Sequence, residues 1–218
     1  MMPGVAAQPL RRISGGGGGI TSAWSLDFLN DVYTLNGSPV TLADIIDKPE
    51  RVGASGLEIL DHNASGSISC IGDWFTDLAA FVALGGTIYI EWEALSAGDR
   101  DVPLYMEEDT NGDSFDIERT TTSVMRAYGW GSDFRGVDNN DVDYGVGIHK
   151  VAVNYTPAFI AMSIDGADTL IDTTPNVMNP MQRAILGGFA ATSKNALYYR
   201  RITLGATVAN SLLPGLTA

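Results

Sequence analysis

The sequence of 218 residues predicts an all-β protein, an antiparallel β-sandwich that carries one short helix. The first observation is a series of roughly ten short apolar segments, spaced about ten residues apart, whose composition favours strands. The second is that Asn-Gly and Asp-Gly pairs, which favour tight hairpin turns, stand between neighbouring segments. The third is that only one segment shows a helical periodicity and no internal repeat is visible, which excludes solenoids and propellers.

The predicted elements of the first third of the domain are short. A strand is expected at 25–33, and Asn36 with Gly37 forms a hairpin turn after it. A single helical turn follows at 41–46, where the sequence fits a capping box. An apolar segment at 57–60 predicts the next strand.

The one clear helix is expected at 74–84. Asp73 is suited to cap its N-terminus, and two glycines after residue 84 end it. Apolar side chains recur at helical spacing and predict one buried face, made of Phe75, Leu78, Ala79 and Val82.

From residue 87 onward almost the whole chain has strand character. Apolar and polar residues alternate in 87–93, and the polar turn at 109–113 predicts a hairpin. Asp165 and Gly166 form a second hairpin turn. The other predicted strands are at 103–107, 115–119, 123–130, 148–155, 159–164, 169–171, 184–189 and 197–204.

The composition excludes several partner classes. Thirteen Lys and Arg against 26 Asp and Glu give a net charge of −13. This disfavours nucleic acid as a partner, because binding to phosphates requires basic side chains. The apolar runs are much shorter than the roughly 20 residues of a membrane-spanning helix, so we expect no membrane insertion. Cys70 is the only cysteine, which leaves no internal disulfide and no cysteine-based zinc site.

Residues 1–23 are predicted to be an extended, glycine-rich N-terminal arm, separate from a β-sandwich domain at 24–218. The backbone entropy of five consecutive glycines disfavours a helix or strand, and no Gly-Lys-Ser/Thr follows to form a phosphate-binding loop. The two arginines are not followed by the apolar stretch of a secretory signal. We expect an assembly arm that lies on neighbouring copies through Arg11, Arg12, Gly15, Gly16, Gly17, Gly18 and Gly19.

Two acidic loops are weak candidates for calcium. Asp109, Asn111 and Asp113 supply oxygens at positions 1, 3 and 5 of a calcium loop, but its required glycine and glutamate are absent. A hairpin turn rich in Asp and Asn explains the same residues better, and a solvated loop explains 138–143. We therefore predict no cofactor, with calcium as the weaker alternative.

Catalytic residues are not predicted. Glu91 and Glu93 share one face of a strand, as the carboxylates of a glycoside hydrolase would, but the further acid such sandwiches carry after the pair is missing. His62 and His149 are the only histidines, too few for a His-rich metal site. Cys70, next to apolar residues, is expected to be buried.

Three aromatic residues near predicted loops are candidates for glycan binding: Trp130, Tyr128 and Tyr144. Sugar rings stack on exposed aromatic faces, whose ring surface is apolar. Packing in the core or at its rim explains the same residues about as well.

Three sections of the chain resemble the laminin-G/concanavalin-A-like jelly-roll family, over roughly residues 57–205. They are 86–93, the hairpin formed by 149–155 with 162–166, and 186–188 with the closing strand 198–204. The resemblance implies a concanavalin A-like jelly-roll sandwich, whose members often bind glycans and sometimes bind calcium at loop tips. Residues 26–40 are similar to lectin-like proteins encoded among the structural genes of tailed bacteriophages.

The main functional hypothesis is a non-enzymatic structural protein of a tailed-bacteriophage virion, as a head decoration or as a tail or fibre component. It would be made in the host cytoplasm and assemble, through its arm and sandwich surface, with other copies of itself and other virion proteins. The alternative is a lectin module that binds a host-surface glycan. A glycoside hydrolase that uses Glu91 and Glu93 is the weakest hypothesis.

Overall fold

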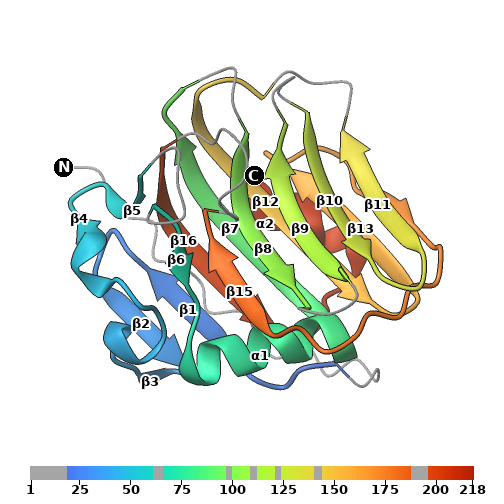
Figure 1. Ribbon diagram of the computed structural model, residues 1–218. Coiled ribbons are helices and arrows are strands. Elements are labelled where there is room, and N and C mark those ends of the chain that lie inside the picture. Colours follow the sequence, from blue (N-terminus) through green and yellow to red (C-terminus); the bar gives the residue numbers. More distant parts are fainter. Residues whose placement is uncertain are drawn as a thin grey trace.

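The chain folds as two antiparallel β-sheets packed face to face, which confirms the predicted jelly-roll sandwich (Figure 1). The computed structural model describes residues 19–60, 66–96, 100–108, 112–120, 124–139, 144–187 and 196–218. Most of the predicted arm, residues 1–18, lies outside these ranges, so its role stays a prediction. Among the described helices, none is long and apolar enough to cross a bilayer.

The larger sheet has ten strands, in the order β14-β13-β12-β7-β16-β1-β2-β3, with β5 beside β16 and β4 beside β5. Its longest strands are β7 (Gly86–Ala94), β12 (Gly147–Thr156) and β16 (Leu197–Gly205). The others are β1 (Trp24–Asp27), β2 (Val32–Leu35), β3 (Ser38–Pro39), β4 (Val52–Gly53), β5 (Gly56–Ile59), β13 (Phe159–Ile164) and β14 (Leu170–Asp172).

The smaller sheet has six strands, in the order β11-β10-β9-β8-β15-β6. Its strands are β6 (Ile68–Ser69), β8 (Asp101–Glu107), β9 (Ser114–Arg119), β10 (Met125–Trp130), β11 (Phe134–Asn139) and β15 (Arg183–Leu186).

Aromatic side chains connect the two sheets with the helix α1 (Gly72–Leu84). The ring of Phe115 on β9 lies 5.2 Å from Tyr155 on β12 and 5.4 Å from Phe81 on α1, measured between centroids. All three side chains are fully buried. Helix α1 therefore closes one edge of the sandwich, along the bottom of Figure 1.

Helix α1 differs from its prediction at its start. It begins at Gly72, its N-cap is Ile71, and Asp73 lies in the first turn instead of at the cap. Its buried residues are Trp74, Leu78, Phe81 and Val82. Large rings fill the gap between the sheets, so the buried face is turned toward these rings, while Phe75 and Ala79 are only partly buried.

Two of the three predicted hairpin turns lie wholly within the described residues and are present; of the third, at 109–113, residues 109–111 lie outside them. Asn36 and Gly37 have φ angles of 52° and 81°, and Asp165 and Gly166 have φ angles of 46° and 80°. Two successive positive φ angles are typical of the type I′ turn, whose twist matches that of the strands it joins.

Short helical segments flank the strands. The predicted helical turn corresponds to the 3-10 helix η1 (Leu42–Asp44), and η2 (Pro49–Arg51) follows it. At the C-terminus, η3 (Asn210–Leu212) and α2 (Leu213–Thr217) lie on the outer face of the larger sheet, where Leu213 packs in a small apolar cluster.

Two features depart from the predicted boundaries. Strand β11 was not predicted: its last two residues, 138 and 139, fall in the predicted acidic loop 138–143, yet the strand pairs with β10 along its whole length. Ile20 is only 4% exposed and its N–H donates to the carbonyl of Gly85 at 2.9 Å. The packed chain therefore includes residues before the predicted domain start at 24.

Gly72 generates the first testable prediction. Its φ is +58°, and a Cβ atom built there would lie 2.4 Å from the carbonyl oxygen of Asp44. We expect Gly72→Ala to lower the free energy of unfolding by about 2 kcal/mol, measured by urea denaturation, because the backbone must leave the left-handed region or displace η1. Gly53→Ala, with no atom near its added methyl group, is the matched control. Equal effects of the two variants would contradict the assignment of strain to Gly72.

Candidate functional site

The outer face of the six-stranded sheet carries charged and aromatic side chains in rows across the strands; we call it the β8–β11 face. Inward side chains of these strands belong to the core, so the residues between them point outward. The strand register aligns these side chains in three rows. The first row consists of Arg183, Glu107, Ser114, Trp130 and Phe134, and the second of Ile185, Tyr105, Asp116, Tyr128 and Gly136. The third row consists of Glu118, Arg126 and Asp138.

Glu118 connects two arginines from either side of β9. Its Oε1 accepts from Nε of Arg126 on β10, and its Oε2 accepts from Nη2 of Arg100, which precedes β8. The Glu118 side chain is fully buried, whereas those of Arg100 and Arg126 are 28% and 37% exposed. A buried carboxylate thus orients two guanidinium groups that reach the surface.

Asp116 is a second buried carboxyl group beneath the same face. It is 2% exposed, and Ser114 Oγ donates to its Oδ2 at 3.0 Å. Burial raises the pKa of Asp116 to about 7, although the hydrogen bonds from Ser114 and Tyr128 and the charges of Arg100 and Arg126 act in the opposite direction. Asp116 therefore exchanges its proton near neutral pH.

An aromatic surface lies beside these charged groups. Trp130 and Phe134 are 54% and 55% exposed. The Phe134 ring centroid lies 5.7 Å from that of Trp130 and 5.8 Å from that of Tyr128, and the Arg126 guanidinium lies 5.2 Å from the Tyr128 centroid. The structure thus brings the predicted residues Tyr128 and Trp130 together and adds Phe134.

Gly136 makes room for this aromatic surface. A Cβ atom at Gly136 would lie 2.7 Å from Cβ of Tyr128 and 3.2 Å from Cζ of Phe134. A side chain at this position would displace one of the two neighbours, so glycine allows the rings to approach each other across β10 and β11.

The opposite end of the face is polar. Arg183 on β15 forms an ion pair with Glu107 on β8, and Tyr105 Oη donates to Glu107 at 2.7 Å. The first row therefore runs from an arginine on β15 to exposed aromatic rings on β10 and β11.

Tyr144, the third predicted aromatic residue, lies elsewhere. It is 4% exposed, its hydroxyl accepts from Nδ2 of Asn139 at 2.8 Å, and its ring packs edge-on against His149. Tyr144 therefore packs in the segment that precedes β12, and its ring is too buried to contact a sugar.

The calcium candidates are only partly described. Asp109 and Asn111 lie outside the described ranges, and the carboxylate of Asp113 accepts from the N–H of Asn179 at 2.7 Å. No group of three or more His, Cys, Asp or Glu side chains in the described part of the chain could hold a metal. Arg11, Arg12 and the glycines up to Gly18 also lie outside it, whereas the backbone of Gly19 approaches Gly85.

The predicted carboxylate pair belongs to the other sheet. Glu91 accepts from Tyr89 Oη at 3.0 Å, and Glu93 forms an ion pair with Arg200 at 3.0 Å, both on the outer face of the ten-stranded sheet. Neither residue lies near the β8–β11 face.

The remaining candidates are structural where they are described. Burial disfavours the charged form of His149, but hydrogen bonds with Asp165 and the Gly145 carbonyl outweigh it and raise the pKa. Burial raises the pKa of the Cys70 thiol to about 12, so this cysteine is protonated and inert. His62 lies outside the described residues.

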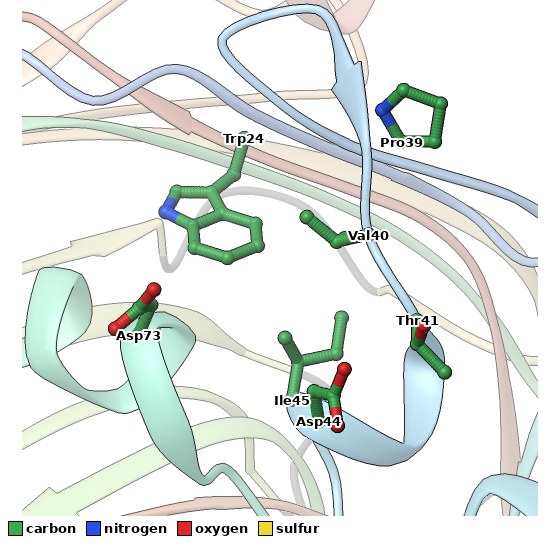
Figure 2. Close-up of a pocket in the computed structure, with 7 residues that line it drawn as sticks. All are labelled: Trp24, Pro39, Val40, Thr41, Asp44, Ile45 and Asp73. Atoms are coloured by element: carbon green, nitrogen blue, oxygen red, sulfur yellow. The ribbon is translucent and has the colours of Figure 1, made fainter.

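A separate pocket of about 270 Å³ opens between β1, β3, η1 and the start of α1. Figure 2 shows the Trp24 ring and the Ile45 side chain around one space, with Asp73 and Asp44 beside it. None of the predicted site residues lines the pocket. Its lining consists of Trp24, Pro39, Val40, Thr41, Asp44, Ile45 and Asp73.

Four residues of the β8–β11 face were not predicted from the sequence: Asp116, Glu118, Arg126 and Phe134. The available signal was the period of two in β9, which places Ser114, Asp116 and Glu118 on one face. It was obscured because Arg119, also charged, points inward to a buried ion pair with Asp101 at 2.7 Å.

Comparison with known proteins supports the fold. No protein-family model and no curated protein sequence matches the chain. Among solved structures, it resembles the CBM40 of the Ruminococcus gnavus IT-sialidase bound to α2,3-sialyllactose, with a TM-score of 0.54, 14% identity, and 74% of this chain and 93% of that chain covered.

Two further structures have the same sandwich. The apo Crh5 transglycosylase matches with a TM-score of 0.56, 17% identity, and coverage of 88% of this chain and 87% of that chain. The binding domain of botulinum neurotoxin DC in complex with SialylT matches with a TM-score of 0.53, 8% identity, and coverage of 73% and 41%. At such identities the likeness shows the concanavalin A-like fold alone.

The position of Asp116 predicts a pH-dependent stability. Its pKa is higher in the folded than in the unfolded chain, so its contribution is complete below the ordinary carboxyl pKa of about 4 and is lost as the pH rises through about 7. We expect Asp116→Asn to raise Tm at pH 8 by roughly 2–4 °C, which corresponds to about 1 kcal/mol, and to change it little at pH 5.

Asp138→Asn, which changes an exposed carboxylate on the same face, is the control for this measurement. Thermal unfolding followed by circular dichroism between pH 5 and 8 compares both variants with the wild type. A Tm difference for Asp116→Asn that stays constant across this range would contradict the buried, titrating carboxyl.

Proposed function

We propose that this chain is a glycan-binding module and that its site is the β8–β11 face. The observation that carries the proposal is the juxtaposition, on one sheet face, of two exposed aromatic rings with arginines oriented by a buried carboxylate. Binding sites commonly combine apolar surface with a few convergent polar groups that fix the orientation of the ligand.

The aromatic half of the face supports contact with a sugar ring. Trp130 and Phe134 expose more than half of their surface, although burial of such rings is strongly favourable. Exposed apolar patches of this kind mark interaction sites. The C–H groups of a sugar ring can pack on these rings while its hydroxyls remain available to polar side chains.

The two arginines of the face, Arg100 and Arg126, favour a sugar that carries a carboxylate as the ligand. A guanidinium has five N–H donors, and Glu118 uses only part of those of Arg100 and Arg126. Two of the similar structures contain sialyllactose and SialylT, sialylated ligands that carry a carboxylate, so we propose an acidic glycan on a host surface as the ligand class.

The carboxylates of this face support binding without cleavage. A glycosidase must present one carboxyl group as acid and another as nucleophile or base to the scissile bond. Glu118 is fully buried with both oxygens bound to arginines, Asp116 is 2% exposed, and Glu107 is bound to Arg183 and Tyr105. Of the carboxylates in the three rows, this leaves Asp138 as the one exposed carboxyl group, and one such group does not supply the pair. We therefore propose a non-enzymatic module, although a transglycosylase has the same fold.

Virion assembly stays a prediction. It depends on the arm, of which residues 1–18 lie outside the described ranges, and none of the similar structures reported above bears on it. Glycan binding is supported by side chains that are described, so we place it first; a virion protein that binds its host could combine both functions.

Removal of the aromatic surface tests the proposal. A glycan array identifies the bound sugars, and calorimetry measures the affinity of the best one for the wild type and for Trp130→Ala/Phe134→Ala. We expect the double variant to lose at least about tenfold in affinity, equivalent to 1.4 kcal/mol, because the ring contacts disappear.

Ile171→Ala is the matched control, since Ile171 is 51% exposed but lies on β14 of the other sheet. It should bind like the wild type. A silent array that includes sialylated glycans, or a folded double variant that keeps its affinity within twofold, would overturn the proposed site.

A further inference from the structure

Asp116 occupies the centre of the β8–β11 face. The register places it between Tyr105 on β8 and Tyr128 on β10, with Ser114 and Glu118 two positions away on its own strand. Its carboxyl group accepts from the Ser114 hydroxyl and is almost completely buried. Any change in its charge therefore acts directly beneath the proposed ligand.

No arginine among the described residues forms an ion pair with Asp116, because the neighbouring guanidinium groups bind other acids. Arg100 and Arg126 both bind Glu118, and Arg183, beyond Tyr105, binds Glu107. The other groups that face Asp116 are Tyr105 and Tyr128 on the adjacent strands and Ser114 on its own strand, and β11 contributes Gly136 to its row.

The proton of Asp116 consequently sets the charge of this part of the face. With the proton bound, the three arginines equal in number the carboxylates Glu107, Glu118 and Asp138; without it, the carboxylates outnumber the arginines by one. Burial weakens dielectric screening, so this single charge affects a ligand more than a charge on the rim would.

We propose that Asp116 is the specificity-determining residue of the face, which accepts a sugar carboxylate beside Arg100 and Arg126 when Asp116 is protonated and disfavours it when Asp116 is ionised. This inference rests on the proposed glycan binding. A neutral sugar gains nothing from the proton, so the preference for acidic over neutral glycans falls as the pH rises.

The direction of this pH dependence follows from the linkage between ligand binding and proton binding. An anion that binds near Asp116 favours its protonated form, so binding takes up a proton and becomes weaker as the pH increases. Because burial raises the pKa of Asp116 to about 7, the change falls in the neutral range.

Calorimetry with 3′-sialyllactose and with lactose tests the inference, on the full chain between pH 5.5 and 8.5. We expect the wild-type affinity for 3′-sialyllactose to fall about tenfold over this range, which corresponds to a ligand-induced pKa change of about one unit. Asp116→Asn should keep the low-pH affinity throughout, and the affinity for lactose should not depend on pH in either protein.

Ser114→Ala provides a second variant, in case Asp116→Asn disturbs the fold. The Ser114 hydrogen bond stabilises the ionised carboxylate, so its loss should move the midpoint of the affinity change to higher pH. Asp138→Asn, which removes an exposed acid from the same face, should keep the wild-type pH profile.

The outcomes separate the two proposals. If 3′-sialyllactose binds but Asp116→Asn keeps the wild-type pH profile, or if the wild-type affinity does not change with pH, the role of Asp116 is wrong while the glycan site stands. If neither sugar binds at any pH, the proposed function fails and the specificity role fails with it.

Discussion

The interaction on which the β8–β11 face depends is the buried carboxylate of Glu118 held between two guanidinium groups. Removal of a charge from water is costly, and it is tolerated here because both oxygens accept charge-assisted hydrogen bonds. The pairs fix Arg126 on β10 and Arg100 ahead of β8 relative to the strand between them. Arg126 in turn lies over Tyr128, so one buried group orders the polar surface and part of the aromatic surface.

The same strands use charged side chains on their inner side to hold the ends of the sandwich. Arg119 on β9 binds Asp101 and the carbonyls of Tyr144 and Ser96. Arg135 on β11 donates to the carbonyls of Thr156, Pro157 and Thr174, and it packs over the ring of Tyr155. Buried arginines therefore anchor loops from both sheets, which gives the exposed face a rigid support.

The sequence predicted the fold because turns and strand alternation are local signals. Asn36-Gly37 and Asp165-Gly166 adopt the positive φ angles that their residue types favour, and strands such as β7 and β12 appear close to the expected positions. Strand β11 was missed, and its last two residues, Asp138 and Asn139, were predicted as part of an acidic loop. Its backbone pairs with β10 through long-range contacts that composition does not contain.

The site was predicted only in part for a related reason. Tyr128 and Trp130 are two residues apart on one strand, so their common face follows from the strand period. Tyr144 had the same composition signal but is buried against His149. Cross-strand register places Arg126 beside Glu118 and Tyr128 beside Asp116. Glu91 and Glu93, which looked similar in sequence, lie on the other sheet. Such pairings depend on which strands become neighbours.

The most direct test of the account is a nuclear magnetic resonance titration of the ¹⁵N-labelled chain with 3′-sialyllactose, in which each backbone amide reports the contact site. We expect the largest chemical-shift changes in β8, β9, β10 and β11, with Arg126, Trp130 and Phe134 among them. Changes centred on the pocket lined by Trp24 and Asp73, or no changes at millimolar sugar, would contradict it.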